Sequence, residues 1–183
     1  LLKIDILGLA NLNIIKQSLR VIKKLYDKEV DIDRIDVNDP NPYKILRKGD
    51  TIGVFQLESE GMKKLLREMK VKNIEELSAV IALYRPGPME FIPLYISNKH
   101  GFTKIQYMDK RLESILDNTY GILVYQEQLM AIANKIAGFS LGQADILRKA
   151  IGKKKLDLLL EQRIKFVEGA VNNGLQKNKA EEL

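Results

Sequence analysis

The sequence contains no cysteine, no tryptophan and a single histidine, His100. Without cysteine the chain can form no disulfide and offers no thiolate as a nucleophile or metal ligand. One histidine cannot supply the repeated imidazoles of common zinc sites. No apolar run approaches the ~20 residues that a membrane-spanning helix needs, and no charged and then apolar leader opens the chain. These absences favour a reducing, cytoplasmic setting.

The length of the chain, 183 residues with 45% hydrophobic residues, is sufficient to bury a core in one larger domain or two small ones. The sequence begins without methionine, inside an apolar segment, and it ends at Glu182 and Leu183 in what resembles the start of a new helix. We therefore expect a fragment of a longer protein, in which residues outside this chain complete any active site.

Positive charge is concentrated in the middle of the chain. Residues 1–60 hold 10 basic and 10 acidic side chains, whereas residues 61–155 hold 16 basic and 9 acidic ones, a net charge of +7. The remaining residues are near balance, with 4 basic and 5 acidic side chains. A basic region of this kind indicates binding to phosphate, in nucleic acid or in a nucleotide, although many basic proteins only have solvated lysine-rich faces.

The apolar pattern predicts a mainly α-helical chain with a few short β-strands. Alternation over Leu1–Leu9 is typical of a strand, and Gly121–Tyr125 of a short apolar strand or extended piece. The helix expected first carries one apolar stripe, so we expect it to pack against another element. Apolar residues at spacings of three and four predict helices over 11–27, 42–48, 61–69, 74–84, 91–98, 110–117, 126–137, 140–152 and 155–173.

Two of these helices begin with a capping-box pattern, Asn73 with Glu76 and Ser140 with Gln143. The helix after Asn73 is stopped by the sequence Arg85-Pro86-Gly87-Pro88, which predicts a stiff turn. Such a turn would hold Arg85 rigidly as a phosphate or base contact, and a purely structural turn explains the same residues equally well.

Lys3 and Asp5 lie on one face of the first expected strand, just before Gly8. The pair suits metal and phosphate chemistry, because a carboxylate can hold Mg²⁺ while an ammonium neutralises a phosphate oxygen. Taken alone, an ordinary ion pair on an exposed edge strand is the better interpretation.

A second acidic pattern, Asp31-x-Asp33, also has the spacing of a metal site. The next alternate position is Ile35, so the third oxygen and the glycine of a calcium loop are missing. The pattern favours a solvated acidic turn.

The segment from Ser140 to Lys155 has the densest positive charge. Arg148 and Lys149 lie in the last turn of the expected helix, and Gly152 is expected to let the following lysines bend back. Complementation of the helix dipole and a solvated lysine run explain part of this charge, but its concentration favours phosphate binding. Five cations fall within eight residues: Arg148, Lys149, Lys153, Lys154 and Lys155.

Aromatic and amide side chains gather around the expected start of the 126–137 helix. Tyr120 and Tyr125 precede Gln126 and Gln128. These groups could stack on or bond to a base, but a buried polar network is the favoured interpretation.

Several stretches together resemble the bacterial DNA polymerase III alpha subunits, the C-family replicative polymerases. They follow the order and approximate spacing of that family and cover nearly the whole chain. They are KIDILGL (3–9), GDTIGVFQLESEGM (49–62), ALYRPGPM (82–89), YGILVYQEQLM (120–130) and AGFSLGQADILRKAIGKKK (137–155). The resemblance implies the end of the palm over residues 1–30 and most of the fingers over residues 31–183, truncated at the C-terminus.

The resemblance also assigns site residues. It implies that Asp5 is a catalytic palm carboxylate and a metal ligand, and that Lys3 lies beside the nucleotide phosphates. Arg148, Lys149 and Lys153 resemble the group in the fingers that contacts the triphosphate. Many family members have arginine where Lys149 stands; lysine keeps the charge but lacks the bidentate fork of arginine. Further candidate contacts to nucleotide or DNA are Arg85, Lys154 and Lys155.

The reaction implied is attack of a primer 3′-hydroxyl on the α-phosphate of a deoxynucleoside triphosphate, with two Mg²⁺ ions at the reacting oxygens. The implied partners are primer-template DNA, nucleotides and other replicase subunits, including the sliding clamp through regions outside this chain. The family's paired palm carboxylates precede Leu1, so the fragment alone is expected to be inactive. The alternatives are a non-catalytic basic helical module that binds nucleic acid and, less favoured, a protein-docking scaffold.

Overall fold

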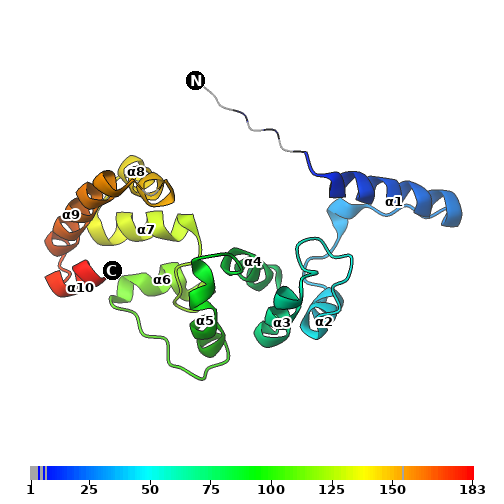
Figure 1. Cartoon of the computed structure of the whole chain (residues 1–183), viewed down its shortest axis with the longest axis horizontal. Coiled ribbons are helices and arrows are strands. Elements are labelled where there is room, and N and C mark those ends of the chain that lie inside the picture. Colours follow the sequence, from blue (N-terminus) through cyan, green and yellow to red (C-terminus); the bar gives the residue numbers. More distant parts are fainter. Residues whose placement is uncertain (1–3, 5, 7, 154) are drawn as a thin grey trace.

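The computed structural model describes residues 4, 6, 8–153 and 155–183. Its helices follow one another along an arc, from α1 at one end to α8, α9 and α10 at the other (Figure 1). The expected mainly helical class is confirmed. The expected strands are not found among the described residues.

The α-helices are α1 (Ala10–Tyr26), α2 (Pro40–Lys48), α3 (Glu60–Met69), α4 (Ile74–Leu83), α5 (Ile92–Lys99), α6 (Glu113–Leu116), α7 (Gln126–Ala137), α8 (Leu141–Gly152), α9 (Leu156–Asn172) and α10 (Lys177–Glu182). Short 3-10 helices are η1 (Ile32–Arg34), η2 (Pro88–Phe91), η3 (Lys110–Leu112) and η4 (Asp117–Thr119).

The expected helices agree with these bounds to within a few residues, and α7 agrees at both ends. One difference lies at 110–117, where the expected single helix is divided into η3, α6 and the start of η4. The strand expected over Leu1–Leu9 falls largely outside the described residues. The segment 122–124 has no regular secondary structure, so a strand does not form there.

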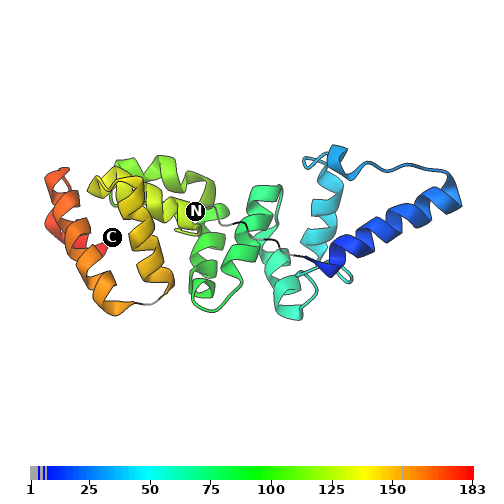
Figure 2. The same cartoon turned by 90° about the horizontal axis from the view of Figure 1, so that it is seen from above.

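Two hydrophobic cores occupy successive parts of the arc. The first is built mainly by α2, α3, α4 and α5, and its fully buried side chains include Leu66, Met69 and Tyr95. The second lies among α6, α7, α8, α9 and α10 around Ile136 and Ala144. Burial of these apolar side chains is the main force that fixes the helices. It holds α8 against both α7 and α9 (Figure 2).

The first helix, α1, buries none of its residues. Its apolar side chains include Leu12, Leu25 and Tyr26, which are 59%, 65% and 74% exposed. The prediction that this helix packs against another element is therefore wrong for the described part of the chain. Amphipathic spacing indicates which face of a helix can be buried, but that face is buried only where another element packs against it.

The acidic segment after α1 forms a solvated turn. The Asp31 carboxylate accepts a hydrogen bond of 3.0 Å from the Asp33 amide, which caps η1, and it pairs with Arg34 at 3.2 Å. The Asp31-x-Asp33 spacing is thus used for local capping, as short polar side chains commonly are in turns. Within the described ranges, no helix has the length and apolarity needed to span a membrane.

Candidate nucleotide phosphate-binding site

Helix α8 presents one apolar face to its neighbours and one charged face to solvent. Ala144, Leu147 and Ala150 are buried at 0%, 6% and 0% exposure, at the spacing of one helical face. The predicted capping box at its start is confirmed, because the Gln143 side chain accepts from the Ser140 amide at 2.8 Å and the Ser140 hydroxyl accepts from the Gln143 amide at 3.3 Å. The burial fixes the rotation of the helix and turns its charged face outward.

The charged face carries a four-residue cluster that joins α8 to the start of α7. Asp145 Oδ1 accepts from Arg148 Nε at 2.9 Å and from Arg148 Nη2 at 2.7 Å, and Asp145 Oδ2 pairs with Lys149 Nζ at 2.6 Å. Arg148 Nη1 also donates to Gln126 Oε1 at 3.0 Å. The structure therefore brings together two of the predicted phosphate-binding cations, Arg148 and Lys149.

An internal carboxylate neutralises part of this cluster. Hydrogen bonds from Lys149 and then Arg148 hold the pKa of Asp145 below its usual range, so Asp145 is ionised at neutral pH. Asp145 is thus a counter-charge within the protein for the cations of α8. One carboxylate cannot neutralise two cations, and this stretch of α8 keeps a net charge of +1.

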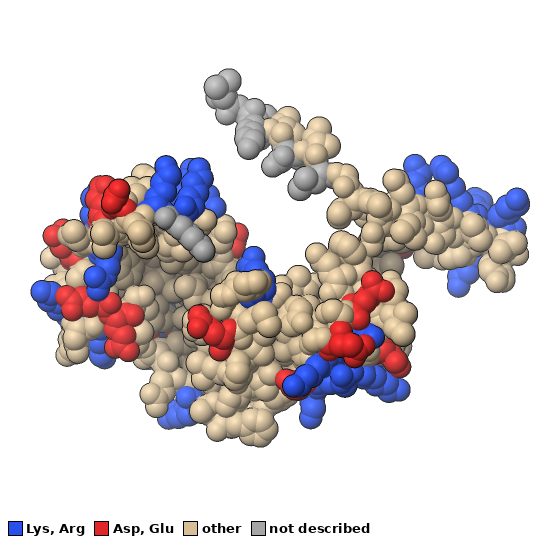
Figure 3. All heavy atoms as spheres, viewed as in Figure 1, with Lys and Arg blue, Asp and Glu red and all other residues tan. Residues whose placement is uncertain are grey.

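The remaining lysines lie at the junction of α8 and α9. Lys153 and Lys155 are exposed, and Lys154 lies outside the described residues. The chain turns here through hydrogen bonds of 3.0 Å from the Lys153 amide to the Lys149 carbonyl and 3.2 Å from the Lys155 amide to the Ala150 carbonyl. Gly152 has no positive φ, so the turn does not depend on the conformational freedom of glycine, contrary to the prediction. Lysine and arginine side chains gather over α8 at the rim of the concave side of the arc (Figure 3).

Arg85 lies in the turn after α4. The Met89 amide donates to the Arg85 carbonyl at 3.2 Å, and Gly87 has φ of +96°, a value that favours glycine. The predicted stiff turn is confirmed. The Arg85 side chain is exposed. Lys3 and Asp5 lie outside the described residues, so their predicted roles stay predictions.

A buried amide fixes the start of α7. Gln128, only 6% exposed, accepts from the amides of Val124 at 2.9 Å and Tyr125 at 3.0 Å and donates to Thr119 Oγ1 at 2.7 Å. For Gln128 the favoured interpretation, a buried polar network, is confirmed. Because Gln128 ties down the turn before α7, it also holds Gln126, the first residue of the helix, beside Arg148.

A second buried network joins α4 and α5 to Tyr120. Glu76 accepts from Lys99 Nζ at 2.6 Å, from the Tyr120 hydroxyl at 2.8 Å and from the Lys72 amide at 2.7 Å. Asn73 caps α4 by accepting from the Glu76 amide at 2.9 Å. The Glu76 side chain is not hydrogen-bonded to the Asn73 amide, so only half of the predicted capping box forms. Its carboxylate is used instead as the counter-charge of a buried lysine.

The pKa values of this network follow from burial and from its hydrogen bonds. Burial alone would raise the pKa of Glu76, but hydrogen bonds from Lys99, Tyr120 and the Lys72 amide outweigh it and hold that pKa below 4.5. Burial, together with the hydrogen bond to Glu76, raises the pKa of Tyr120 to about 12. The tyrosine is therefore a neutral donor, and Glu76 is an ionised acceptor.

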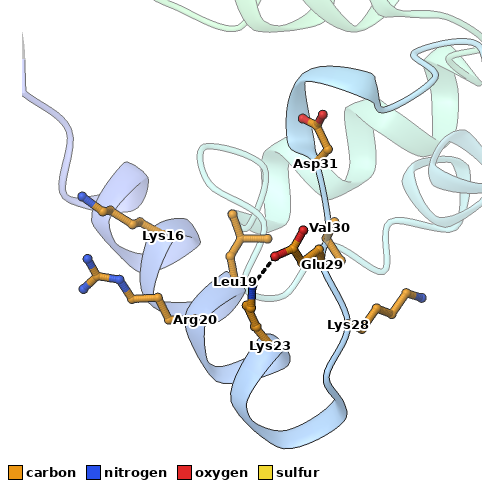
Figure 4. A pocket seen from close by; sticks show the side chains of 8 residues that line it. All are labelled: Lys16, Leu19, Arg20, Lys23, Lys28, Glu29, Val30 and Asp31. Carbon is orange, nitrogen blue, oxygen red and sulfur yellow. Dashed lines mark hydrogen bonds and ion pairs between the residues drawn. The ribbon is translucent and has the colours of Figure 1, made fainter.

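A second basic surface lies at the other end of the arc. An open hollow of about 450 Å³ separates α1 from the chain that follows it, and an ion pair between Lys23 and Glu29 crosses it (Figure 4). Lys16 and Arg20 extend from α1 away from that pair. Their exposed positions and the openness of the hollow favour a solvated face over a ligand site. The hollow is lined by Lys16, Leu19, Arg20, Lys23, Lys28, Glu29, Val30 and Asp31.

Two members of the α8 cluster, Asp145 and Gln126, were not among the predicted site residues. Asp145 carries a recognisable signal, because carboxylates three and four residues before a cation pair with it on a helix. Gln126 lies 22 residues before Arg148, so its role depends on how α7 packs against α8. No local pattern in the sequence indicates it.

Comparison with known proteins gives one consistent family. Residues 11–174 match the family model described as bacterial DNA polymerase III alpha subunit finger domain. The whole chain is 49% identical to a protein of Halalkalibacterium halodurans and 48% identical to one of Staphylococcus aureus strain COL, both named DNA polymerase III subunit alpha. The chain spans only 16% and 17% of the lengths of these two curated relatives.

Proposed function

The chain belongs to the bacterial DNA polymerase III alpha subunit finger domain family, and from this premise we propose that its α8 cluster binds the triphosphate of an incoming deoxynucleotide. The proposed binding residues are Arg148, Lys149 and Lys153. The proposal concerns this chain as part of a longer, template-directed DNA polymerase, since the chain spans only 16% and 17% of the lengths of the two relatives. We also propose that residues 1–30 belong to the palm and residues 31–183 to the fingers.

The observation that carries the proposal is the geometry of the charged face of α8. Arg148 and Lys149 stand side by side on the solvent face of a helix whose other face is buried, with Lys153 one turn further on. A guanidinium recognises phosphate through paired N–H donors, and a lysine adds a mobile point charge. A rigid helix that presents both suits the recognition of several linked phosphates.

The proposed reaction transfers a nucleotide to a primer 3′-hydroxyl with Mg²⁺. Within the described residues there is no group of three or more His, Asp or Glu side chains that could hold a metal ion. Asp5 is proposed as one ligand and Lys3 as a neighbouring phosphate contact. A single carboxylate does not make a Mg²⁺ site, so the metal chemistry belongs to the assembled polymerase and the proposed part of this chain is phosphate binding.

The partners follow from the same proposal. Primer-template DNA and deoxynucleoside triphosphates are the proposed substrates, and Arg85, Lys154 and Lys155 are proposed as further contacts. Contacts with other replicase subunits, including the sliding clamp, are proposed for parts of the polymerase outside this chain. A cytoplasmic location fits this role.

Arg148→Ala in the full-length polymerase tests the proposal. We expect KM for deoxynucleotide to rise roughly 10- to 100-fold, because a hydrogen bond between charged groups contributes about 1.5–3 kcal/mol. The affinity for primer-template DNA should change less than about twofold. KM from steady-state primer extension and Kd from DNA-binding titrations measure the two effects.

Arg163→Ala is the matched control, since it removes the same charge from the exposed face of α9. It should leave nucleotide KM unchanged. Equal losses of nucleotide use and DNA affinity in Arg148→Ala would contradict the proposal and support a basic module that binds nucleic acid without selecting nucleotide.

A further inference from the structure

Three of the N–H donors of Arg148 are already engaged within the protein. A guanidinium has five such donors. Nε and Nη2 donate to Asp145 Oδ1 at 2.9 and 2.7 Å, and Nη1 donates to Gln126 Oε1 at 3.0 Å. Two donors remain, one on each terminal nitrogen. Two donors on one guanidinium are what a bidentate contact with a phosphate requires.

We propose that Gln126 and Asp145 are positioning residues, which orient the Arg148 guanidinium so that its two remaining donors face a nucleotide phosphate. The proposal rests on the proposed function of Arg148 and adds a role for two residues that the comparisons do not assign. Neither residue needs to touch the nucleotide. Each acts by removing orientations of Arg148 that would not bind phosphate.

The energetic reason lies in side-chain entropy. An exposed arginine loses rotamer freedom when it is held in one orientation, and arginine is among the side chains for which this loss is largest. The Arg148 side chain is 30% exposed, so packing alone does not fix it. Because Asp145 and Gln126 already hold the Arg148 side chain in one orientation, that side chain loses less conformational entropy when nucleotide binds. The affinity for nucleotide is therefore higher.

The two acceptors differ in how they are held. Asp145 lies one turn before Arg148 on the same helix, so α8 itself sets their distance. Gln126 belongs to α7 and is fixed through the buried contacts of Gln128 with Thr119, Val124 and Tyr125. The orientation of Arg148 is therefore set from two helices at once, which constrains the plane of the guanidinium more closely than either contact alone.

The test uses the full-length polymerase with Gln126→Ala. Loss of a single acceptor should raise KM for deoxynucleotide roughly threefold to tenfold and leave the Kd for primer-template DNA unchanged. In an Arg148→Ala background, Gln126→Ala should have no further effect on KM, because Gln126 acts only through Arg148. Glu127→Ala, at the next exposed position of α7, is the matched control and should behave as the wild type.

Two variants at Asp145 separate orientation from charge. Asp145→Ala and Asp145→Asn remove the same charge, but only asparagine keeps an acceptor oxygen for Arg148. The proposal expects KM to rise several-fold more in Asp145→Ala than in Asp145→Asn. Equal values for the two variants would overturn a positioning role for Asp145.

The outcomes distinguish this proposal from the proposed function. If Arg148→Ala leaves nucleotide KM unchanged, the proposed function fails and positioning fails with it. If Arg148→Ala raises KM but Gln126→Ala does not, or if their effects multiply in the double variant, the proposed function stands and positioning by Gln126 is overturned. A lower melting temperature without a change in KM would show that Gln126 is only structural, and it would also overturn the proposal.

Discussion

At the scale of single residues, buried or half-buried carboxylates decide how the positive charge of this chain is arranged. Glu76 neutralises Lys99 inside the first core, and Asp145 partly neutralises Arg148 and Lys149 at the surface. The buried pair costs desolvation of both ions, which its hydrogen bonds offset, whereas the surface cluster stays hydrated. Removing the carboxylate of the buried pair should therefore lower the stability of the fold more than removing the carboxylate of the surface cluster.

Glu76→Gln should destabilise the chain by about 3 kcal/mol, since it leaves the Lys99 ammonium buried without a counter-charge. The Lys99 and Glu76 side chains are only 3% and 8% exposed. Urea denaturation followed by circular dichroism measures the change. The exposed neighbour Glu75→Gln is the control and should lie within about 0.5 kcal/mol of the wild type. An equally small loss for Glu76→Gln would show that the pair contributes little.

The pH dependence of stability should carry the signature of the same carboxylate. The folded pKa of Glu76 is below the ordinary value of 4.5, so its contribution is fully present above that value and is lost as pH falls through the folded pKa. Asp109 adds to this loss at lower pH, because its hydrogen bonds with Arg111 lower its pKa to about 2. Denaturation curves between pH 7 and pH 3 should show a shallower fall in stability for Glu76→Gln than for the wild type.

At the scale of elements, close approach of α7 and α9 fixes the second core. A Cβ added at Gly169 in α9 would lie 2.2 Å from the Ala137 carbonyl oxygen and 3.1 Å from its carbonyl carbon. Backbone atoms at these distances cannot move aside as a flexible side chain could. Glycine at 169 is therefore a packing requirement, whereas a Cβ at Gly152 would meet nothing within 4 Å.

Gly169→Ala should destabilise the chain by about 2–3 kcal/mol, the usual range for overpacking. Gly152→Ala, also within a helix, should be neutral or stabilising by up to about 1 kcal/mol, because alanine is the better helix former. Midpoints of urea denaturation compare the two directly. A similar loss for both would mean that the α7 and α9 contact does not constrain position 169.

The helices were predictable because their signals are local. Apolar spacing, the Ser140 cap and the glycine after α7 lie within a few residues of the structure that they specify. The segment 121–125 was harder to predict, because its apolar residues are typical of a strand. The amides of Val124 and Tyr125 are satisfied by the Gln128 side chain and not by a neighbouring strand, and Ile122 is buried in the first core. A side-chain partner of this kind has no periodic signature.

The candidate site was predictable in its cations but only partly in their partners. Arg148 and Lys149 are evident from charge density, and Asp145, although not predicted, has the helical spacing of an ion-pair partner. Gln126 and the buried pair of Glu76 with Lys99 depend on contacts across 22 and 23 residues. Such contacts exist only once the helices pack, so the sequence alone cannot indicate them.

At the scale of the whole molecule, α1 lies towards one end of the arc and α8 towards the other (Figure 1), and lysine and arginine side chains gather over both helices (Figure 3). On the α8 surface, the Arg148 guanidinium donates to two acceptors from different helices, Asp145 and Gln126. The α1 surface has one internal ion pair and otherwise exposed side chains. This contrast supports the proposal that nucleotide binds at α8 and not at α1.

The central claim is that one triphosphate is held between Asp5 at the metal-bound end and the α8 cluster at the other. The crystal structure of the full-length polymerase with primer-template DNA, Mg²⁺ and a non-hydrolysable deoxynucleotide tests it most directly. We expect Arg148 to donate two hydrogen bonds to the phosphates while it keeps its contacts with Asp145 and Gln126, and we expect the Asp5 carboxylate to bind the metal ion. Phosphates bound elsewhere, with Arg148 beyond hydrogen-bonding reach of them, would contradict the claim.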